Sequence, residues 1–306
     1  MPFGIAPTEW RETRVLHGVE LTVVARHPDE ETSRAAIATA FAAAEEVGGK
    51  LLDGLRGSET DILAHVPSHL WVEVSATTYD ALLEALEIAE ATEGAYDPTW
   101  TALLKAWGLH EDGEPRIPRD FEIDMALRRV DWTNVEVTDE EGLQARRLNR
   151  RTELRLGGLA RGAMLDAAIA QLRLAGVTAG RASTNDEHAT YGATRAHPWE
   201  VALPRGTALL RDGAIAIVRR GPDVETPDGP IHDRFDPRSG RPAAGTTWVA
   251  VATRRASTGA AYADAVFAMG REGRAFVEER EELLAAIESE DGIVWVSEGL
   301  VVRADD

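Results

Sequence analysis

The alternation of apolar and polar residues predicts short strands and a few longer helices. A β-branched run around Val19 predicts a first strand over 14–26. The alanine-rich stretch that follows predicts a helix over 30–47, which the Gly48-Gly49 pair would end. The same patterns predict further strands at 71–74, 128–138, 145–156, 198–203, 207–218 and 247–253, and helices at 102–107, 160–175, 258–269 and 272–289.

Two further elements complete the expected order. Ser75 or Thr77 can cap a helix that Gly94 ends, and a closing hairpin is expected from Ile293 to Val302. Because strand runs are not regularly interleaved with helices, we expect an α+β fold with mixed or antiparallel sheets flanked by helices. The 306 residues fit a single domain built from two packed subregions.

Charge and composition exclude several classes of function. The chain has 33 basic and 52 acidic side chains, a formal charge of −19, which argues against nucleic-acid binding through phosphate neutralisation. It has no cysteine, so a metal would need oxygen or imidazole ligands. No apolar run is long enough to span a bilayer, and we expect a cytoplasmic protein without a membrane segment.

Two glycine-containing segments place turn residues beside acidic or aromatic groups. The first, Gly94-Ala95-Tyr96-Asp97-Pro98-Thr99, is followed by Trp107-Gly108, and by spacing alone it reads as a helix stop with a proline turn. The second, Leu156-Gly157-Gly158-Leu159-Ala160-Arg161-Gly162, predicts a tight turn that opens a helix. Such a turn lets backbone N–H groups and the helix dipole attract a phosphate.

Taken in order, these segments resemble the FAD:protein FMN transferase family, also called the ApbE family. Members carry G-x-F-D-P-T with a later W-G, and then L-G-G-I-A-K-G-x-x-x-D. Three later features also match: Trp199 with Pro204, the Asp236-Pro237-Arg238-Ser239-Gly240 turn, and a late helix that ends at Gly270.

The resemblance implies an ApbE-like fold with a ligand cleft between two subregions. It also implies FAD as the substrate, Mg²⁺ at its pyrophosphate, and transfer of FMN to a threonine or serine hydroxyl of a target flavoprotein, with Trp107 near the ligand. It assigns catalysis to Asp264 and Arg161, and it assigns the metal to Asp264 and the backbone carbonyl of Ala160. The residues that it assigns to FAD binding are Tyr96, Asp97, Gly157, Gly158, Ala160, Gly162, Asp166, Asp233 and Arg238.

The sequence departs from the family pattern where the chemistry is carried. Arg161 replaces the usual lysine, and Ala260 stands at the position of the usual metal-binding aspartate, with Asp264 one turn later. The family's glycine-glycine-aspartate becomes Asn185-Asp186-Glu187, and its histidine before the D-P-R turn becomes Asp233.

Two interpretations follow from these departures. In the first, the transferase keeps its activity with a rebuilt metal site, to which Asp264, Asp186, Glu187 and Asp233 supply oxygens. In the second, the activity has lapsed, and the cleft serves another flavin, nucleotide or partner. Asp264 can equally be a solvated or helix-paired side chain.

Overall fold

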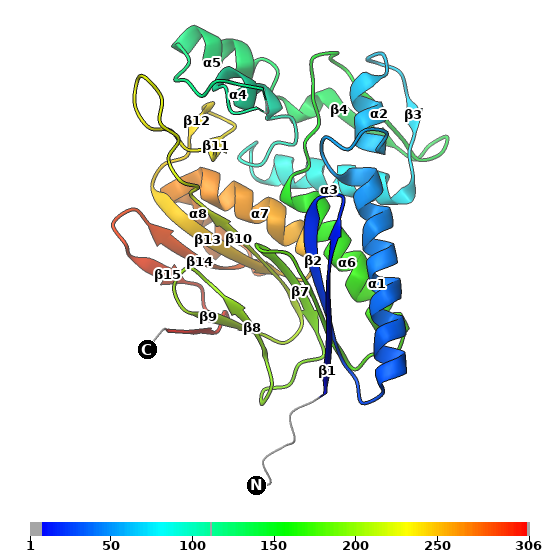
Figure 1. The fold of residues 1–306 in the computed structure, drawn as a ribbon. Helices are drawn as coiled ribbons and strands as arrows, with labels where there is room; N and C mark the ends of the chain where they lie inside the picture. The colour runs from blue at the N-terminus through cyan, green and yellow to red at the C-terminus, as the bar shows by residue number, and fades with distance from the viewer. Residues whose placement is uncertain (1–7, 111, 305–306) are drawn as a thin grey trace.

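The core of the molecule is an eight-stranded sheet with the order β1-β2-β6-β7-β10-β13-β14-β15. The computed structural model describes residues 8–110 and 112–304. Every neighbouring pair in this main sheet is antiparallel, which confirms the α+β class (Figure 1). The strands are β1 (Glu9–Leu16), β2 (Val19–Arg26), β6 (Ala179–Ser183), β7 (Glu187–Tyr191), β10 (Gly213–Arg219), β13 (Thr246–Thr253), β14 (Leu284–Ser289) and β15 (Val294–Val296).

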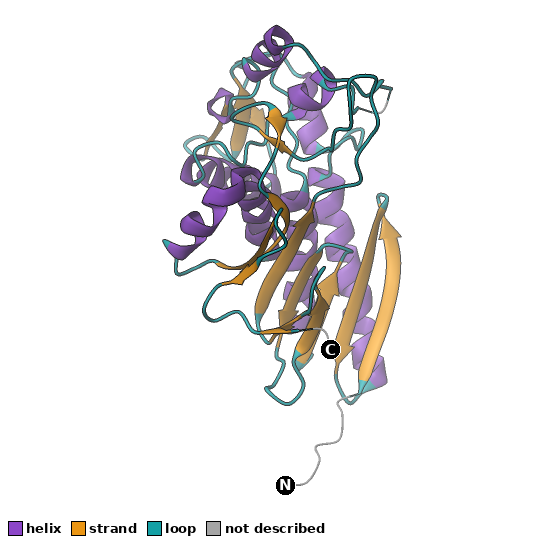
Figure 2. Ribbon diagram, turned by 90° about the vertical axis from the view of Figure 1, so that its left-hand side faces the viewer, coloured by secondary structure: helices purple, strands orange, loops and turns teal. Residues whose placement is uncertain are grey.

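Three long helices cover one face of the main sheet (Figures 1 and 2). They are α1 (Glu30–Leu51), α6 (Gly158–Leu174) and α7 (Ala256–Met269). Their apolar sides form the largest core with the facing strands, and Phe41 and Phe267 are among its largest fully buried side chains. This helical layer positions the start of α6 and the middle of α7 beside the cleft described below.

A small sheet covers the opposite face and creates a second core. It consists of β8 (Trp199–Ala202), β9 (Thr207–Leu210) and β16 (Val302–Arg303). In β13, Val249 and Val251 face the helices, whereas Trp248 and Ala250 face this small sheet. Burial on both faces explains why the apolar run of this strand does not alternate with polar residues.

The segments around Trp107 and Phe235 form an upper subregion with a core of its own (Figure 1). Leu103, Trp107 and Phe235 lie in this third core, where α4 packs against α5. The elements outside the main sheet and its covering layers are α2 (Glu59–His65), β3 (Val72–Glu73), α3 (Ala76–Ala91), α4 (Thr101–Ala106), α5 (Asp120–Leu127), η1 (Trp132–Asn134), β4 (Val135–Thr138), β5 (Gln144–Arg147), β11 (Phe235–Asp236), β12 (Arg241–Pro242), η2 (Gly270–Glu272) and α8 (Gly273–Glu278).

The N-terminal third differs from its sequence-based prediction at two places. The single strand expected over 14–26 is a hairpin of β1 and β2, because His17 and Gly18 both adopt positive φ and form a two-residue turn. The helix expected to stop before Gly48 continues to Leu51. Gly48 lies inside this helix, and a Cβ there would come within 3.0 Å of Met164 on α6. The glycine therefore serves the contact between α1 and α6.

Other helix and strand boundaries differ from the sequence-based prediction because strand pairing and helix capping determine where these elements begin and end. Helix α5 forms between the helix predicted at 102–107 and the strand predicted at 128–138, where the sequence indicates no element. Its first turn is closed by Glu122, which accepts the Arg119 N–H. The strands expected over 128–138 and 145–156 shorten to β4 and β5, which pair with each other. Their shortening leaves the chain before Gly157 free to line the cleft.

The C-terminal prediction is wrong in two respects. The helix expected over 272–289 ends at Glu278, and Leu284–Ser289 is strand β14 between β13 and β15. The hairpin expected from Ile293 to Val302 is absent from the described chain, because β15 pairs with β14 and β16 pairs with β9. In both cases, pairing with a neighbouring strand determined the secondary structure, and the local sequence preference did not.

The half-buried His188 on β7 makes stability pH-dependent. Desolvation, with Arg181 and Arg219 nearby, lowers its pKa from 6.5 to about 4. Because the unfolded chain binds a proton on this ring near pH 6.5 and the folded chain does not, stability falls as pH drops from 6.5 towards 4. Glutamine does not titrate in this range, so the free energy of unfolding of His188→Gln should fall less between pH 7 and pH 4.5 than that of the unchanged protein. We expect a difference of roughly 2 kcal/mol in urea unfolding series. Equal pH slopes for both proteins would contradict this assignment.

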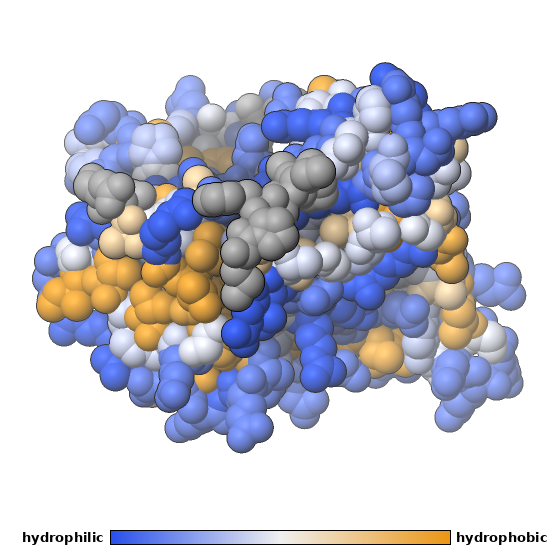
Figure 3. Space-filling view, turned by 90° about the horizontal axis from the view of Figure 1, so that it is seen from below, coloured by the Kyte–Doolittle hydropathy of each residue, from blue (hydrophilic) through white to orange (hydrophobic). Residues whose placement is uncertain are grey.

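The surface reflects the large acidic excess. The face in Figure 3 is mainly hydrophilic, with apolar side chains in separate patches. Exposed large apolar residues include Val15, Leu174 and Ile293. Among the described residues, no helix combines the length and hydrophobicity needed to cross a bilayer.

Candidate functional site

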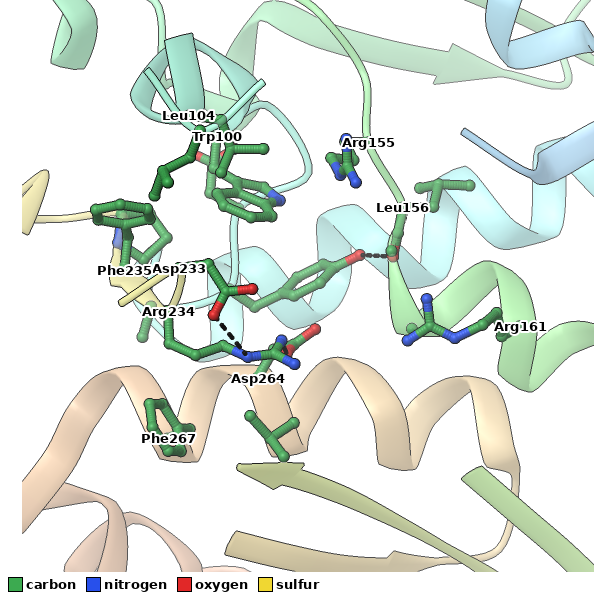
Figure 4. Close-up of a pocket in the computed structure, with 18 residues that line it drawn as sticks. Trp100, Leu104, Arg155, Leu156, Arg161, Asp233, Arg234, Phe235, Asp264 and Phe267 are labelled. Carbon is green, nitrogen blue, oxygen red and sulfur yellow. Dashed lines mark hydrogen bonds and ion pairs between the residues drawn. The ribbon is translucent and has the colours of Figure 1, made fainter. Parts of the chain in front are cut away.

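A cavity of about 310 Å³ lies where the upper subregion meets α6 and α7 (Figure 4). Its wall combines the chain around Tyr96, the Gly157-Gly158 turn, the 233–237 segment and Asp264 on α7. Arg155, Arg161 and Arg234 also line it, so a chain with a net charge of −19 gathers three guanidinium groups in one cavity. Asp97, Asp233 and Asp264 line it as well, so an anionic ligand with an apolar part would have to contact the arginines directly.

The glycine turn at the start of α6 is held by Asp53. This carboxylate accepts the N–H groups of Leu156 and Gly157, both at 2.9 Å. Gly157 has φ +59° and ψ −125°, a conformation that disfavours any other residue, and no side chain caps the helix behind it. The positive end of the α6 dipole therefore faces the cavity, as the sequence predicts for a phosphate-binding turn.

Tyr96 and Asp97 form the buried floor of the site. The Tyr96 hydroxyl donates to the carbonyl of Leu156 at 3.3 Å, and burial raises the pKa of this phenol well above its usual value. Asp97 accepts the N–H and hydroxyl of Thr99 and the N–H of Trp132. Its pKa is raised by burial despite these hydrogen bonds. Both residues line the cavity, and they also join the upper subregion to the glycine turn.

Arg161 is fixed by a buried acid on the main sheet. Its Nη2 and Nε donate to Glu187 Oε1 at 2.6 and 2.9 Å, and Thr184 donates a short hydrogen bond to the other carboxylate oxygen. Desolvation opposes the charge on Arg161, but Glu187 outweighs it, and the pKa of the guanidinium is raised. Arg161 is thus a fixed cation at the wall of the cavity.

Asp264 and Arg234 face each other across the lower part of the cavity (Figure 4). Arg234 Nη1 lies 3.5 Å from Asp264 Oδ1, and its Nε lies 4.0 Å from Asp233. Desolvation raises the pKa of Asp264, although Arg234 and Arg161 both oppose that shift. Asp264 is therefore a carboxylate with two cations near it.

Aromatic rings form the outer wall. The Trp100 and Phe235 centroids are 6.5 Å apart, and both rings line the cavity. Trp107, which the resemblance places near the ligand, packs behind Phe235 with centroids 5.3 Å apart and donates its indole N–H to Gly240. The tryptophan that lines the cavity is therefore Trp100 and not Trp107.

Four residues predicted for ligand binding lie outside the cavity lining. Ala160 is fully buried, and a Cβ on Gly162 would come within 2.4 Å of the Ala256 backbone, so this glycine lets α6 meet α7. The Asp166 carboxylate accepts the N–H groups of Ala256 and Ser257 at the start of α7. Arg238 pairs with Asp236 at 2.9 Å. In the structure these four residues support the architecture around the cleft.

The structure also adds residues that the sequence did not single out. Asp53 holds the glycine turn, Arg155 and Arg234 bring charge, and Trp100 and Phe235 form the aromatic wall. Arg155 and Trp100 flank the motifs used for the resemblance, so proximity to those motifs was the available signal. Asp53 carried no such signal.

The donor set does not fit a magnesium ion. Magnesium favours six oxygens in octahedral geometry. Within residues 8–110 and 112–304, no three His, Asp or Glu side chains gather to hold a metal. The methyl of Ala260 stands where the resemblance expects a carboxylate, and it lies 3.0 Å from the position of a Cβ built on Gly158. The four acids proposed for a rebuilt site are each ion-paired with an arginine.

Comparisons with known proteins agree with this architecture. The sequence model described as the ApbE family matches residues 17–287. A curated "FAD:protein FMN transferase" of Rhodobacter capsulatus is 27% identical over 214 residues, which cover 65% of this chain and 40% of that protein. The chain thus spans well under half the length of this relative.

Solved structures share the fold over nearly the whole chain. An ApbE protein of Thermotoga maritima has 25% identity and a TM-score of 0.83, covering 95% of this chain and 97% of its own. The Pseudomonas stutzeri flavinyl transferase ApbE has 17% identity and a TM-score of 0.82, covering 96% of this chain and 97% of its own. At the latter identity the likeness concerns the fold alone.

Proposed function

Because this chain belongs to the ApbE family, we propose that it binds FAD in the cleft and transfers the FMN half to a hydroxyl group of a target flavoprotein. The observation that carries the proposal is the Gly157-Gly158 turn at the start of α6, which shares one cavity with three arginines and an aromatic wall. Phosphates suit the first two features, and a flavin or adenine ring suits the third.

The proposed reaction breaks the phosphoanhydride bond of FAD and forms a phosphoester bond with the acceptor hydroxyl. The acceptor hydroxyl oxygen bonds to the phosphorus of the FMN phosphate, and the bond from that phosphorus to the bridging oxygen breaks. AMP leaves with the bridging oxygen, and the hydroxyl proton passes to a base. Asp264 fits the role of base, since it lines the cavity and its pKa is raised by desolvation.

Positive charge would favour this transfer. Arg161 and the α6 terminus lie where negative charge on the phosphoryl oxygens can be stabilised. The family resemblance implies Mg²⁺ at the pyrophosphate, but the donor set of the described cleft does not fit this ion, and the proposed transfer uses none. Buried Glu187 positions Arg161 and has no direct role in the reaction.

A second candidate function is flavin binding without transfer. It is favoured by Ala260 in place of the expected aspartate and by the pairing of Glu187 and Asp264 with arginines. In this case the cleft would hold FAD or a related nucleotide, and no AMP would be released.

One experiment separates these functions. The purified chain is titrated with FAD while flavin fluorescence is followed, and it is then incubated with FAD and an apo-flavoprotein acceptor. We expect saturable binding, AMP in the chromatogram and an FMN mass increment on the acceptor. Binding without AMP or acceptor modification would support the second function, and absence of binding would overturn both.

The aromatic wall gives a direct prediction for FAD binding. We expect Trp100→Ala to raise the Kd for FAD about tenfold, because stacking of a base or flavin on an aromatic ring is lost. Trp71→Ala is the matched control, since Trp71 lies outside the cavity lining with its ring 4.2 Å from the Arg146 guanidinium. If the Trp100 and Trp71 variants have the same Kd for FAD, neither the flavin nor the adenine ring stacks on Trp100.

A further inference from the structure

Most acids near the cleft are ion-paired with arginines, and the oxygens of buried Asp97 accept hydrogen bonds from Thr99 and Trp132. Glu187 holds Arg161 at 2.6 Å, and Asp264 lies 3.5 Å from Arg234. Outside the cavity lining, Asp186 pairs with Arg219 at 2.9 Å. A metal ion would have to displace these guanidinium groups before it could gather carboxylate ligands.

Glu187 fixes one edge of the Arg161 guanidinium and leaves the other edge able to bind a ligand. The Glu187 side chain that anchors it is only 4% exposed and occupies Nε and Nη2. Among the described residues, Nη1 of Arg161 has no hydrogen-bond partner. A guanidinium fixed on one edge in this way presents its other edge without further loss of side-chain entropy.

The Arg234 side chain also has a hydrogen-bond donor without a partner in the described chain. Its buried Nε has no hydrogen-bond partner in the described chain, and Asp233 at 4.0 Å is too distant to be one. An unsatisfied buried donor is costly, and it shows that the nearby carboxylates satisfy the Arg234 guanidinium only in part. Arg161 and Arg234 reach the cavity from opposite sides in Figure 4.

We propose that Arg161 and Arg234 take the place of a divalent cation at the pyrophosphate of the bound dinucleotide, so that binding needs no metal. Two guanidinium groups supply the same charge as one Mg²⁺, and they donate directional hydrogen bonds to phosphate oxygens. The ligand named here rests on the proposed function, because FAD supplies the pyrophosphate. The negative charge of the Asp264 carboxylate then opposes binding of the anion, and this carboxylate is not a metal ligand.

The test compares FAD affinity in excess EDTA and in excess MgCl₂, using flavin fluorescence and calorimetry. We expect the two Kd values to agree within about twofold, since no metal takes part. Arg161→Met and Arg234→Met should each raise Kd in EDTA by roughly tenfold or more, through loss of charge-assisted hydrogen bonds. Arg219→Met is the matched control, because it removes an equivalent charge from an ion pair outside the cavity lining.

Asp264→Asn distinguishes the two kinds of site most sharply. With arginines at the pyrophosphate, removing this negative charge should leave FAD binding in EDTA unchanged or tighter. Binding that requires Mg²⁺, that is lost in Asp264→Asn and that survives both arginine substitutions would overturn the proposal.

Inorganic pyrophosphate separates failure of this proposal from failure of the proposed function. If FAD does not bind, but pyrophosphate binds in EDTA and loses affinity in Arg161→Met, the arginine site stands and FAD is the wrong ligand. If neither FAD nor pyrophosphate binds in EDTA, the arginine site is wrong. Circular dichroism and unfolding curves of each variant show whether it is folded.

Discussion

Replacement of Asp53 by alanine is expected to lower the free energy of unfolding by about 3 kcal/mol and to weaken FAD binding more than tenfold. The carboxylate accepts the N–H groups of Leu156 and Gly157, and charge-assisted hydrogen bonds contribute roughly 1.5–3 kcal/mol each. Burial raises the pKa of Asp53, and relief of this desolvation offsets part of the loss. Urea unfolding and FAD titration measure the two effects.

Asp29→Ala provides the matched control for this prediction. Asp29 also accepts a backbone N–H, that of Thr32 at 2.7 Å, but it caps α1 at the surface. Its loss should cost about 1 kcal/mol and leave FAD binding unchanged. If Asp53→Ala is destabilised yet binds FAD normally, the glycine turn does not hold the ligand.

The second large effect is expected where α6 meets α7. Gly162→Ala should lower the free energy of unfolding by about 3 kcal/mol, even though alanine is the better helix former. A Cβ at Gly162 would lie 2.4 Å from the backbone of Ala256 and Ser257, so the two helices must separate. Thermal and urea unfolding measure the loss.

Gly49→Ala is the same substitution in another helix, but we expect it to raise the free energy of unfolding. The nearest atom to a Cβ at Gly49 is His17 Nε2, at an ordinary 3.6 Å. Alanine should therefore stabilise α1 by up to about 1 kcal/mol. A Gly162 variant as stable as the Gly49 variant would contradict the close packing of α6 and α7.

The proposed role of the arginines addresses how an acidic protein would bind an anionic dinucleotide. A net charge of −19 gives a repulsive background for a dinucleotide, so attraction must come from charges fixed inside the cleft. Buried Glu187 holds Arg161 in position, and Arg161 and Arg234 both line the cavity. Preorganised cations in a partly desolvated cavity act more strongly than the same charges at the surface.

Local patterns determined the parts of this protein that depend on neighbouring residues. The Gly157-Gly158 turn, the helix behind it and the buried run of β13 can all be read from the sequence. Each depends on a local property: a positive φ that favours glycine, helix propensity, or an unbroken apolar run. The order of the motifs was also sufficient for the family and its α+β fold, which the structure and the comparisons confirm.

Only the tertiary structure decided how these parts meet. Leu284–Ser289 is a strand because it fills a place between β13 and β15, although its sequence also suits a helix. Asp53 reaches Gly157 across 104 residues, and Arg234 meets Asp264 only because the 233–237 segment lies over α7. Such contacts join surfaces far apart in the chain, and no local periodicity encodes which side chains face each other across a cleft. The charges that line the cavity are therefore brought together only in the folded chain.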